Sequence, residues 1–324
     1  MRQSSIVGLN ANLKRAPLVI TKIRKLRLRI CHHRPSIASW GIIRQRVGDM
    51  NLKDRIGVDL GRRVSLEEGI AWAAERGVKF IDAQLDITPN GLTTFDAARC
   101  DAIREAAGAA DIHLGLHTLS GVNIAEYSPF LSEAVDDYLK AYIDVAVRLK
   151  AEWVVVHPGH HFGDKEERME AAVGHISKAS AYAEEVGATL FLENMNWEPD
   201  LAEVHYLAHT LEEAQYYFER LTLPNLKWSF TVNHAHLVPD GIDGFIDGLD
   251  MSRLGEVRIA DCTGEYEIHM KPGEGNIDFG HMFERIEASG FKGHYMNAFG
   301  NLEDMNDARD YLVERAVVAG VDAR

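Results

Sequence analysis

Histidines and a glutamate stand at the ends of several short apolar runs in this 324-residue chain. His117 lies near the end of IHLGLHTL, His157 follows WVVV, Glu193 lies near the end of TLFLEN, and His234 ends LKWSFTVNH. Imidazole and carboxylate groups bind transition metals, and imidazole also exchanges protons near neutral pH. The pattern therefore predicts a metal centre or acid–base chemistry, provided that the fold brings these ends together.

A second segment with chemical potential follows the apolar run EVRIADC, which itself contains Arg258. It reads TGEYEIHMKPGEGNIDF and supplies Glu267, His269 and Lys271. Histidines that do not stand at the end of an apolar run are interpreted as structural residues that form hydrogen bonds: His32, His33, His113, His175, His205 and His209.

The elements that must position these groups alternate eight times between an apolar run and a longer amphipathic segment. The runs lie at 56–61, 79–86, 112–119, 153–159, 189–194, 226–234, 256–262 and 294–299. This alternation is typical of parallel βαβ units, and eight units predict a single α/β domain, a (β/α)8 TIM barrel. Active sites of that fold lie at the carboxyl ends of the strands, so the polar residues above should share one mouth.

The amphipathic segments carry helix signals. Ser65, with Glu68 three residues later, forms a predicted capping box, and Gly77 should end that helix. Ser132 is the predicted N-cap of the helix that runs to residue 150. Its predicted buried face consists of Val135, Leu139, Ile143, Ala146 and Leu149.

Charge and composition exclude several classes of function. Residues 1–49 carry 11 Lys and Arg against one acid, which leaves a net charge of −24 on residues 50–324. A domain of that sign repels nucleic acid, and no apolar run is long enough to span a membrane. Three widely spaced cysteines without CxxC spacing predict a reducing, cytoplasmic setting.

The first 49 residues form a basic leader that we predict to lie outside the fold, which should occupy residues 50–324. One interpretation is a transit peptide; the favoured one is that Met50 is the true start of the protein.

The motifs resemble those of the xylose-isomerase-like superfamily over about residues 52–315. The resemblance rests on His117, on HPG at 157–159, on EN at 193–194, on His234 in NHAHL, and on EIHMKPGEGNIDF. That superfamily includes sugar and sugar-phosphate isomerases and epimerases, dehydratases, and endonuclease IV.

The resemblance implies a divalent metal held by a strand-five Glu, an Asp three residues before the strand-six His, a strand-seven His and a strand-eight Glu. This chain keeps Glu193 but has Thr231, Arg258 and Asn297 at the other places. The positions that flank this site in endonuclease IV are retained as two sets of three residues. The first set is His117, His157 and Glu193, and the second is His234, Glu267 and His269. Each set is expected to be able to hold zinc, manganese or a similar ion.

Arg258 could supply the positive charge of the site in place of a metal ion. Its guanidinium is then expected to pair with Glu193 or to bind a carboxylate or phosphate of the substrate. Glu193 is then the expected general base, with His234 or His157 as the acid. The alternative for Arg258 is a buried ion pair with Asp261 in a barrel that has lost activity.

The expected substrate-binding residues follow strands five to eight: Asn196, Trp197, Lys271, Asn297 and Phe299. No nucleotide is expected, because the GEG at 273–275 lacks the spacing of a phosphate loop. The sequence thus predicts an isomerase or epimerase acting on a sugar, polyol or related hydroxy-carbonyl compound. The alternatives are a dehydratase of a cyclic polyol or hydroxy-keto acid, and a catalytically silent carbohydrate-binding relative. A homo-oligomer is compatible with either class.

Overall fold

The computed structural model describes Val47 and residues 50–324, and eight parallel strands within them close into a barrel. The strands are β1 (Ile56–Gly61), β2 (Phe80–Ala83), β3 (His113–His117), β4 (Trp153–Val156), β6 (Leu190–Glu193), β8 (Leu226–Thr231), β9 (Leu254–Ile259) and β10 (His294–Asn297). Neighbours in the barrel follow chain order, and β10 closes it against β1. The predicted (β/α)8 barrel is therefore confirmed.

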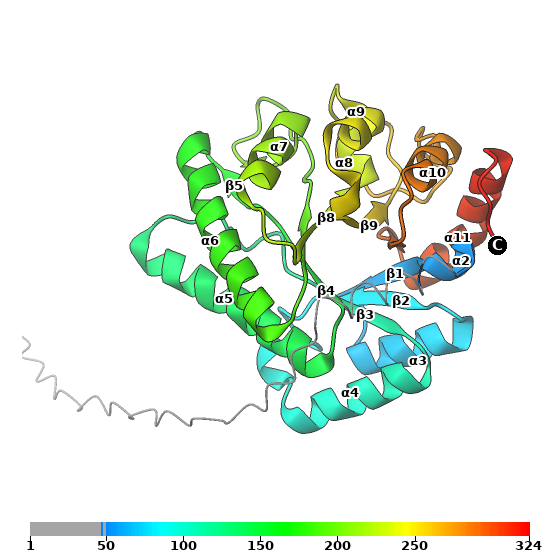
Figure 1. Ribbon diagram of the computed structural model, residues 1–324, viewed down its shortest axis with the longest axis horizontal. Helices are drawn as coiled ribbons and strands as arrows, with labels where there is room; N and C mark the ends of the chain where they lie inside the picture. The colour runs from blue at the N-terminus through cyan, green and yellow to red at the C-terminus, as the bar shows by residue number, and fades with distance from the viewer. Residues whose placement is uncertain (1–46, 48–49) are drawn as a thin grey trace, which may run out of the picture. The chain divides into compact units, whose positions relative to one another are not determined.

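Helices surround the strands on the outside (Figure 1). They are α2 (Leu52–Arg55), α3 (Leu66–Arg76), α4 (Ala97–Ala109), α5 (Pro129–Leu149), α6 (Lys165–Val186), α7 (Leu211–Arg220), α8 (Val232–His236), α9 (Gly241–Gly248), α10 (Phe279–Ala288) and α11 (Leu302–Val318). Short 3-10 turns at Leu92–Thr94 and Met251–Arg253 complete the described set. Within it, no helix combines the length and the apolar character that a membrane span requires.

The helix signals in the sequence are confirmed at one helix and corrected at another. Ser65 and Glu68 make both bonds of the capping box, and Gly77 ends α3 with a φ of 64°. The N-cap prediction for α5 is wrong, since the helix begins at Pro129 and its N-cap is Ser128 rather than Ser132. Pro129 supplies the helical φ and needs no amide partner in the first turn, so the helix begins one turn earlier than predicted.

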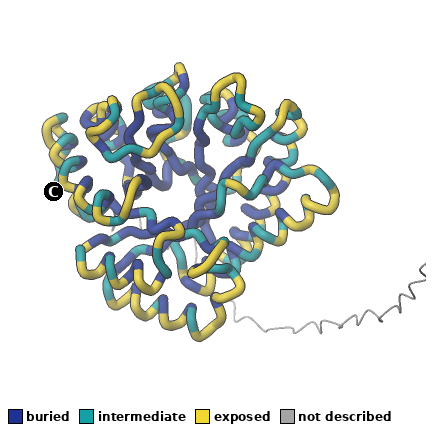
Figure 2. Tube along the Cα trace, turned by 180° about the vertical axis from the view of Figure 1, so that it is seen from behind, coloured by how far each residue is buried: buried dark blue, intermediate teal, exposed yellow. Residues whose placement is uncertain are grey.

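Alternate residues of each strand point to opposite sides of the barrel wall, as the two-residue period of a strand requires. One side of the wall packs against the helices, and the other forms a separate interior cluster. That cluster contains Phe80, Trp153, Val155, Phe191 and Met296, together with Val47. Figure 2 shows the resulting distribution, with buried residues along the strands and exposed residues on the outer faces.

The basic leader predicted at residues 1–49 lies, apart from Val47, outside the described residues. Val47 itself is buried against the interior cluster.

The structure differs from the predicted strands in two places at the end of the barrel that carries the carboxyl ends of the strands. The sixth barrel strand ends at Thr231, and His234 lies in the short helix α8 rather than in the strand. In addition, His160–His161 (β5) and His205–Tyr206 (β7) pair as a small antiparallel ribbon outside the barrel. The ribbon is built from the loops that follow β4 and β6, so it belongs to the face that carries the strand ends.

Candidate metal centre

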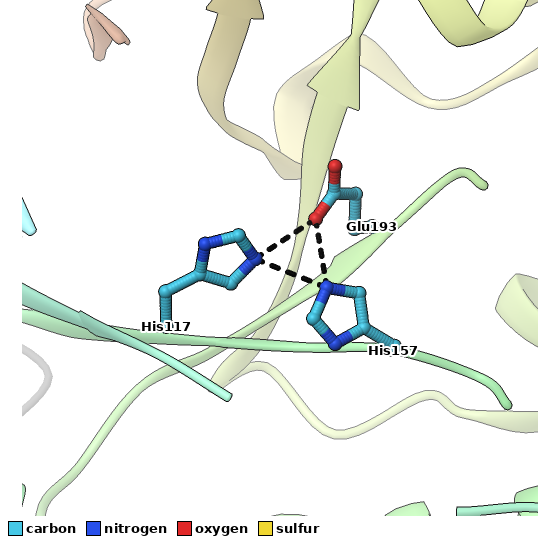
Figure 3. A group of neighbouring side chains, drawn as sticks. All are labelled: His117, His157 and Glu193. Carbon is cyan, nitrogen blue, oxygen red and sulfur yellow. Dashed lines mark hydrogen bonds and ion pairs between the residues drawn. The ribbon is translucent and has the colours of Figure 1, made fainter. Parts of the chain in front are cut away.

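His117, His157 and Glu193 converge at the carboxyl ends of β3, β4 and β6 (Figure 3). The Nε2 atoms of the two histidines are 3.0 Å apart, and each lies 3.2 Å from Oε2 of Glu193. All three side chains are buried. Three potential ligand atoms therefore form a nearly equilateral triangle in a region that excludes solvent.

The edges of this triangle fit a metal ion. Bond lengths of about 2.0–2.2 Å place neighbouring ligand atoms about 2.8–3.6 Å apart in octahedral or tetrahedral geometry. The three observed distances, 3.0, 3.2 and 3.2 Å, fall inside that interval. The donor set of two imidazoles and one carboxylate also suits zinc or manganese.

Surrounding groups orient the three ligands. Thr118 Oγ1 lies 3.1 Å from Nδ1 of His157, and Thr231 Oγ1 donates a hydrogen bond to Oε1 of Glu193. Such bonds from outside the ligand set fix the ring tautomer and the carboxylate orientation. Burial by itself would raise the pKa of Glu193, but the hydrogen bonds from His117 and His157 hold it well below its usual range. Glu193 is therefore ionised, as a ligand must be.

A second group, His234, Glu267 and His269, lies close to the first. Oε1 of Glu267 is 3.4 Å from Nε2 of His234 and 2.7 Å from Nε2 of His269. The Nδ1 atoms of both rings lie within hydrogen-bond distance of main-chain carbonyls, those of Asn194 and Ala298. An N–H at each Nδ1 leaves a lone pair on Nε2 when the ring is neutral. Two lone pairs and a carboxylate then face one another, and a cation or a proton must lie among them.

The two groups are neighbours, because Nδ1 of His234 lies 3.8 Å from Oε1 of Glu193. Burial lowers the pKa of His234, but the nearby Glu267 outweighs it and raises that pKa overall. Burial would raise the pKa of Glu267, yet His234 and His269 lower it strongly. The structure therefore brings together all six residues that the sequence placed in two ligand sets.

The four-ligand set that the resemblance implies does not fit this chain. Thr231 donates its hydroxyl hydrogen bond to Glu193, which leaves a weak neutral oxygen where a carboxylate would be needed. The amide of Asn297 donates to the carbonyl of Met305 in α11, on the helix side of the barrel wall. Arg258 carries a positive charge where a ligand would need a lone pair.

Arg258 instead lies among three carboxylates inside the barrel. Its Nη1 is 2.7 Å from Asp82 and 3.4 Å from Glu256, and its Nη2 is 3.0 Å from Asp59. The guanidinium is 2% exposed, and both Asp82 and Glu256 are fully buried. Neither partner expected from the sequence, Glu193 or Asp261, makes an ion pair with Arg258 in the described part of the chain. Both terminal nitrogens are committed to carboxylates, so the geometry argues against a substrate clamp.

Asp261, the other partner considered for Arg258, binds main-chain amides of the loop that follows β9. Its carboxylate accepts hydrogen bonds from the main-chain amides of Cys262, Gly273, Gly275 and Ile277. It therefore fixes the loop that carries Glu267 and His269.

The sequence did not single out the carboxylates around Arg258. Burial raises the pKa of Asp82 to about 7, although Arg258 opposes this effect. Asp59 and Asp82 each interrupt an apolar run, in VDLG and FIDA. A charged residue at an inward position of a barrel strand is the signal that would have identified both.

The residues predicted to bind substrate have mixed positions. Phe299 is buried in the core that packs against the helices, and Lys271 pairs with Asp304 at 3.1 Å. Asn196 is buried and donates to Glu198, while Trp197 is half-buried against the core on the side of β8 and β9. Of these four side chains, Asn196 and Trp197 lie on the loop that follows Glu193 directly.

Comparison with known proteins adds a family model and several distant relatives. A family model described as a xylose isomerase-like TIM barrel matches residues 70–314. A D-tagatose 3-epimerase-like protein of known structure gives a TM-score of 0.71 at 22% identity, covering 82% of this chain and 98% of that one. A D-psicose 3-epimerase from Clostridium cellulolyticum H10 gives 0.69 at 16% identity, covering 82% and 99%. The uncharacterized protein MJ1614 of Methanocaldococcus jannaschii is 23% identical over 264 residues, covering 80% and 95%. At these identities the structural likeness shows the fold.

Proposed function

The chain belongs to the xylose isomerase-like TIM barrel family, and from that premise we propose that it catalyses a metal-assisted isomerisation of a sugar or a related small hydroxy-carbonyl compound. The activity in the names of the two solved neighbours, sugar epimerisation, supports the substrate class. The observation that carries the proposal is the pair of three-residue groups at the strand ends, each with its ligand atoms turned toward one another.

His117, His157 and Glu193 would hold the first ion, and His234, Glu267 and His269 would hold the second. A bound divalent ion polarises a carbonyl oxygen and so acidifies the hydrogens on the neighbouring carbon. Ions also suit the charge of the site. The described carboxylates inside the barrel and at its mouth outnumber the guanidinium of Arg258. They are Asp59, Asp82, Glu193, Glu256 and Glu267.

The geometry favours Glu267 over Glu193 as the proton acceptor. Both oxygens of Glu193 are engaged, Oε2 by the two histidines and Oε1 by Thr231. Glu267 uses Oε1 for its histidine contacts and leaves Oε2 buried without a partner. A carboxylate with one free oxygen can take the proton from the carbon next to the carbonyl and return it to the carbonyl carbon, so one base suffices for both carbon positions. The isomerisation is complete when the proton of the neighbouring hydroxyl has also passed to the former carbonyl oxygen.

Exchange of substrate hydrogens with deuterated solvent tests this proposal. Protein loaded with Mn²⁺ or Zn²⁺ is incubated in D2O with a panel of aldoses, ketoses and cyclic keto-polyols, and deuterium next to the carbonyl is measured by NMR. We expect ion-dependent exchange with at least one compound, lost in Glu267→Gln and kept in Glu274→Gln. Glu274 is the matched control, an exposed carboxylate of the same loop. Ion binding without exchange across the panel would overturn the isomerase proposal and favour a silent binding protein.

A further inference from the structure

The ribbon of β5 and β7 is tied to the first metal group by main-chain hydrogen bonds. The amide of Leu207 donates to the carbonyl of Gly159 at 3.0 Å, and the amide of Met195 donates to the carbonyl of Ala208 at 3.1 Å. Gly159 and Met195 each lie two residues beyond a ligand of that group, His157 and Glu193 respectively. The ribbon is therefore anchored beside the first metal group.

Asn123 holds the ribbon in one position. Its Nδ2 donates to the carbonyl of His160 at 3.1 Å, and its Oδ1 accepts from the amide of His160 at 2.9 Å. Gly159, next to this contact, has a φ of 91°, and a Cβ there would lie 2.4 Å from Oδ1 of Asn123. The close approach requires glycine, so the position of the ribbon is fixed by the backbone.

Three rings form a row along the ribbon. Tyr206 and His160 meet edge to face, with centroids 6.0 Å apart at 79°. His160 and Phe162 meet in the same way, at 5.6 Å and 73°. The outermost ring, Phe162, is 55% exposed, and the other two are half-buried. Neighbouring rings of the row are nearly perpendicular, and Phe162 is its exposed member, with no ring other than His160 packed against it in the described part of the chain.

Polar groups flank both ends of the row. At the outer end Asp164 accepts from the amide of Phe162 at 3.1 Å and from the hydroxyl of Tyr127 at 2.9 Å. At the inner end, burial and the nearby Glu198 raise the pKa of Tyr206. Aromatic rings beside carboxylates and hydroxyls suit a sugar ring, whose C–H face packs on the rings while its hydroxyls bond to the polar groups.

We propose that the row of Tyr206, His160 and Phe162 is a subsite for a second sugar ring, so that the substrate is a glycoside or disaccharide rather than a free monosaccharide. This inference rests on the proposed function, since it places the reacting ring at the ions and the second ring on the ribbon. Continuity of the row with Gly159 and Met195 favours a substrate-borne occupant over a separate partner.

Sugar binding to the Mn²⁺-loaded protein tests the subsite. The probes are methyl β-D-glucopyranoside, cellobiose, maltose and phenyl β-D-glucopyranoside, measured by calorimetry and by saturation-transfer NMR. An added stacking contact predicts that one disaccharide binds about fivefold more tightly than the methyl glycoside. Phe162→Ala should remove that advantage and leave the methyl glycoside unchanged. Phe130→Ala is the matched control, because Phe130 is also exposed and makes no described ring contact with the row.

The outcomes separate the two proposals. Equal affinities for the methyl glycoside and both disaccharides, or a disaccharide advantage that survives Phe162→Ala, would overturn the subsite while the proposed function stands. Tighter binding of the phenyl glycoside than of either disaccharide would overturn the second sugar ring in favour of an apolar substituent. If no probe binds and the exchange experiment also fails, both proposals fall.

Discussion

Replacing Arg258 by methionine should destabilise the barrel strongly and in a way that depends on pH. Methionine keeps much of the apolar stem of Arg258 but removes the charge that Asp59, Asp82 and Glu256 share. Removing one partner of a buried ion pair costs about 3–5 kcal/mol, because the remaining charge stays buried without compensation. For a domain of this size each kcal/mol lowers the melting temperature by about 2–4 °C, so we expect a loss of roughly 6–20 °C.

The pH dependence of that loss identifies its cause. Without the guanidinium the pKa values of the three carboxylates rise in the folded state, so the folded protein binds more protons than the unfolded chain. Stability is then lost as pH rises, and the deficit of the variant should be largest at pH 8 and shrink toward pH 5. Millimolar guanidinium chloride should restore part of the melting temperature, whereas sodium chloride at the same concentration should not.

Thermal unfolding followed by circular dichroism at pH 5, 6.5 and 8 measures these effects. Arg220→Met is the control, since Arg220 is exposed at the end of α7. An unchanged melting temperature for Arg258→Met at pH 8, or a deficit that does not vary with pH, would refute the electrostatic reasoning.

Three further predictions concern the cap, the interior and the ions. Ser65→Ala should lower stability by about 1 kcal/mol through loss of the capping box, measured by urea unfolding. Asp82→Asn should become more stable relative to wild type as pH rises from 4 to 8. Burial raises the pKa of Asp82 from 3.8 to about 7, so ionisation of Asp82 destabilises the folded wild type over this range. Melting curves at several pH values between 4 and 8 check the sign. Zn²⁺ affinity should fall as pH is lowered from 8 to 6. Burial lowers the pKa values of His117 and His234, but Glu193 and Glu267 raise them overall, so protons compete with the ion; titration calorimetry at three pH values checks this.

The architecture could be predicted from the sequence because each unit carries local signals. The apolar runs have the right length for strands, and residues such as Ser65 and Glu68 mark helix ends through contacts within one turn. Ser132 misled the prediction of α5 because Ser128 and Pro129 form an equally good start one turn earlier.

The approach of His117, His157 and Glu193 to one another could be predicted from the sequence, since barrel topology brings strand ends together, whereas the division of six residues into two candidate ligand sets came from the family resemblance. His234 shows the limit of that reasoning: it joins the site from helix α8, yet its position in the chain next to the strand end was sufficient.

The interior around Arg258 could not be predicted, because it depends on which side of the barrel wall each residue faces. A shift of one residue moves a side chain to the other side, and Asn297 illustrates this by bonding to Met305 in α11. Asp82 and Asp59 lie 176 and 199 residues from Arg258 in sequence, so a local pattern can mark each inward carboxylate but cannot show that it pairs with Arg258.

The ion content of the purified protein tests the central claim most directly. After loading with Zn²⁺ and gel filtration, elemental analysis should find two ions per chain. His117→Ala and His269→Ala should each keep one, and the double variant none, with folding of every variant checked by circular dichroism. Absence of ions from the wild type, retention of two by the double variant, or a third ion in the wild type beside Arg258 would contradict the account.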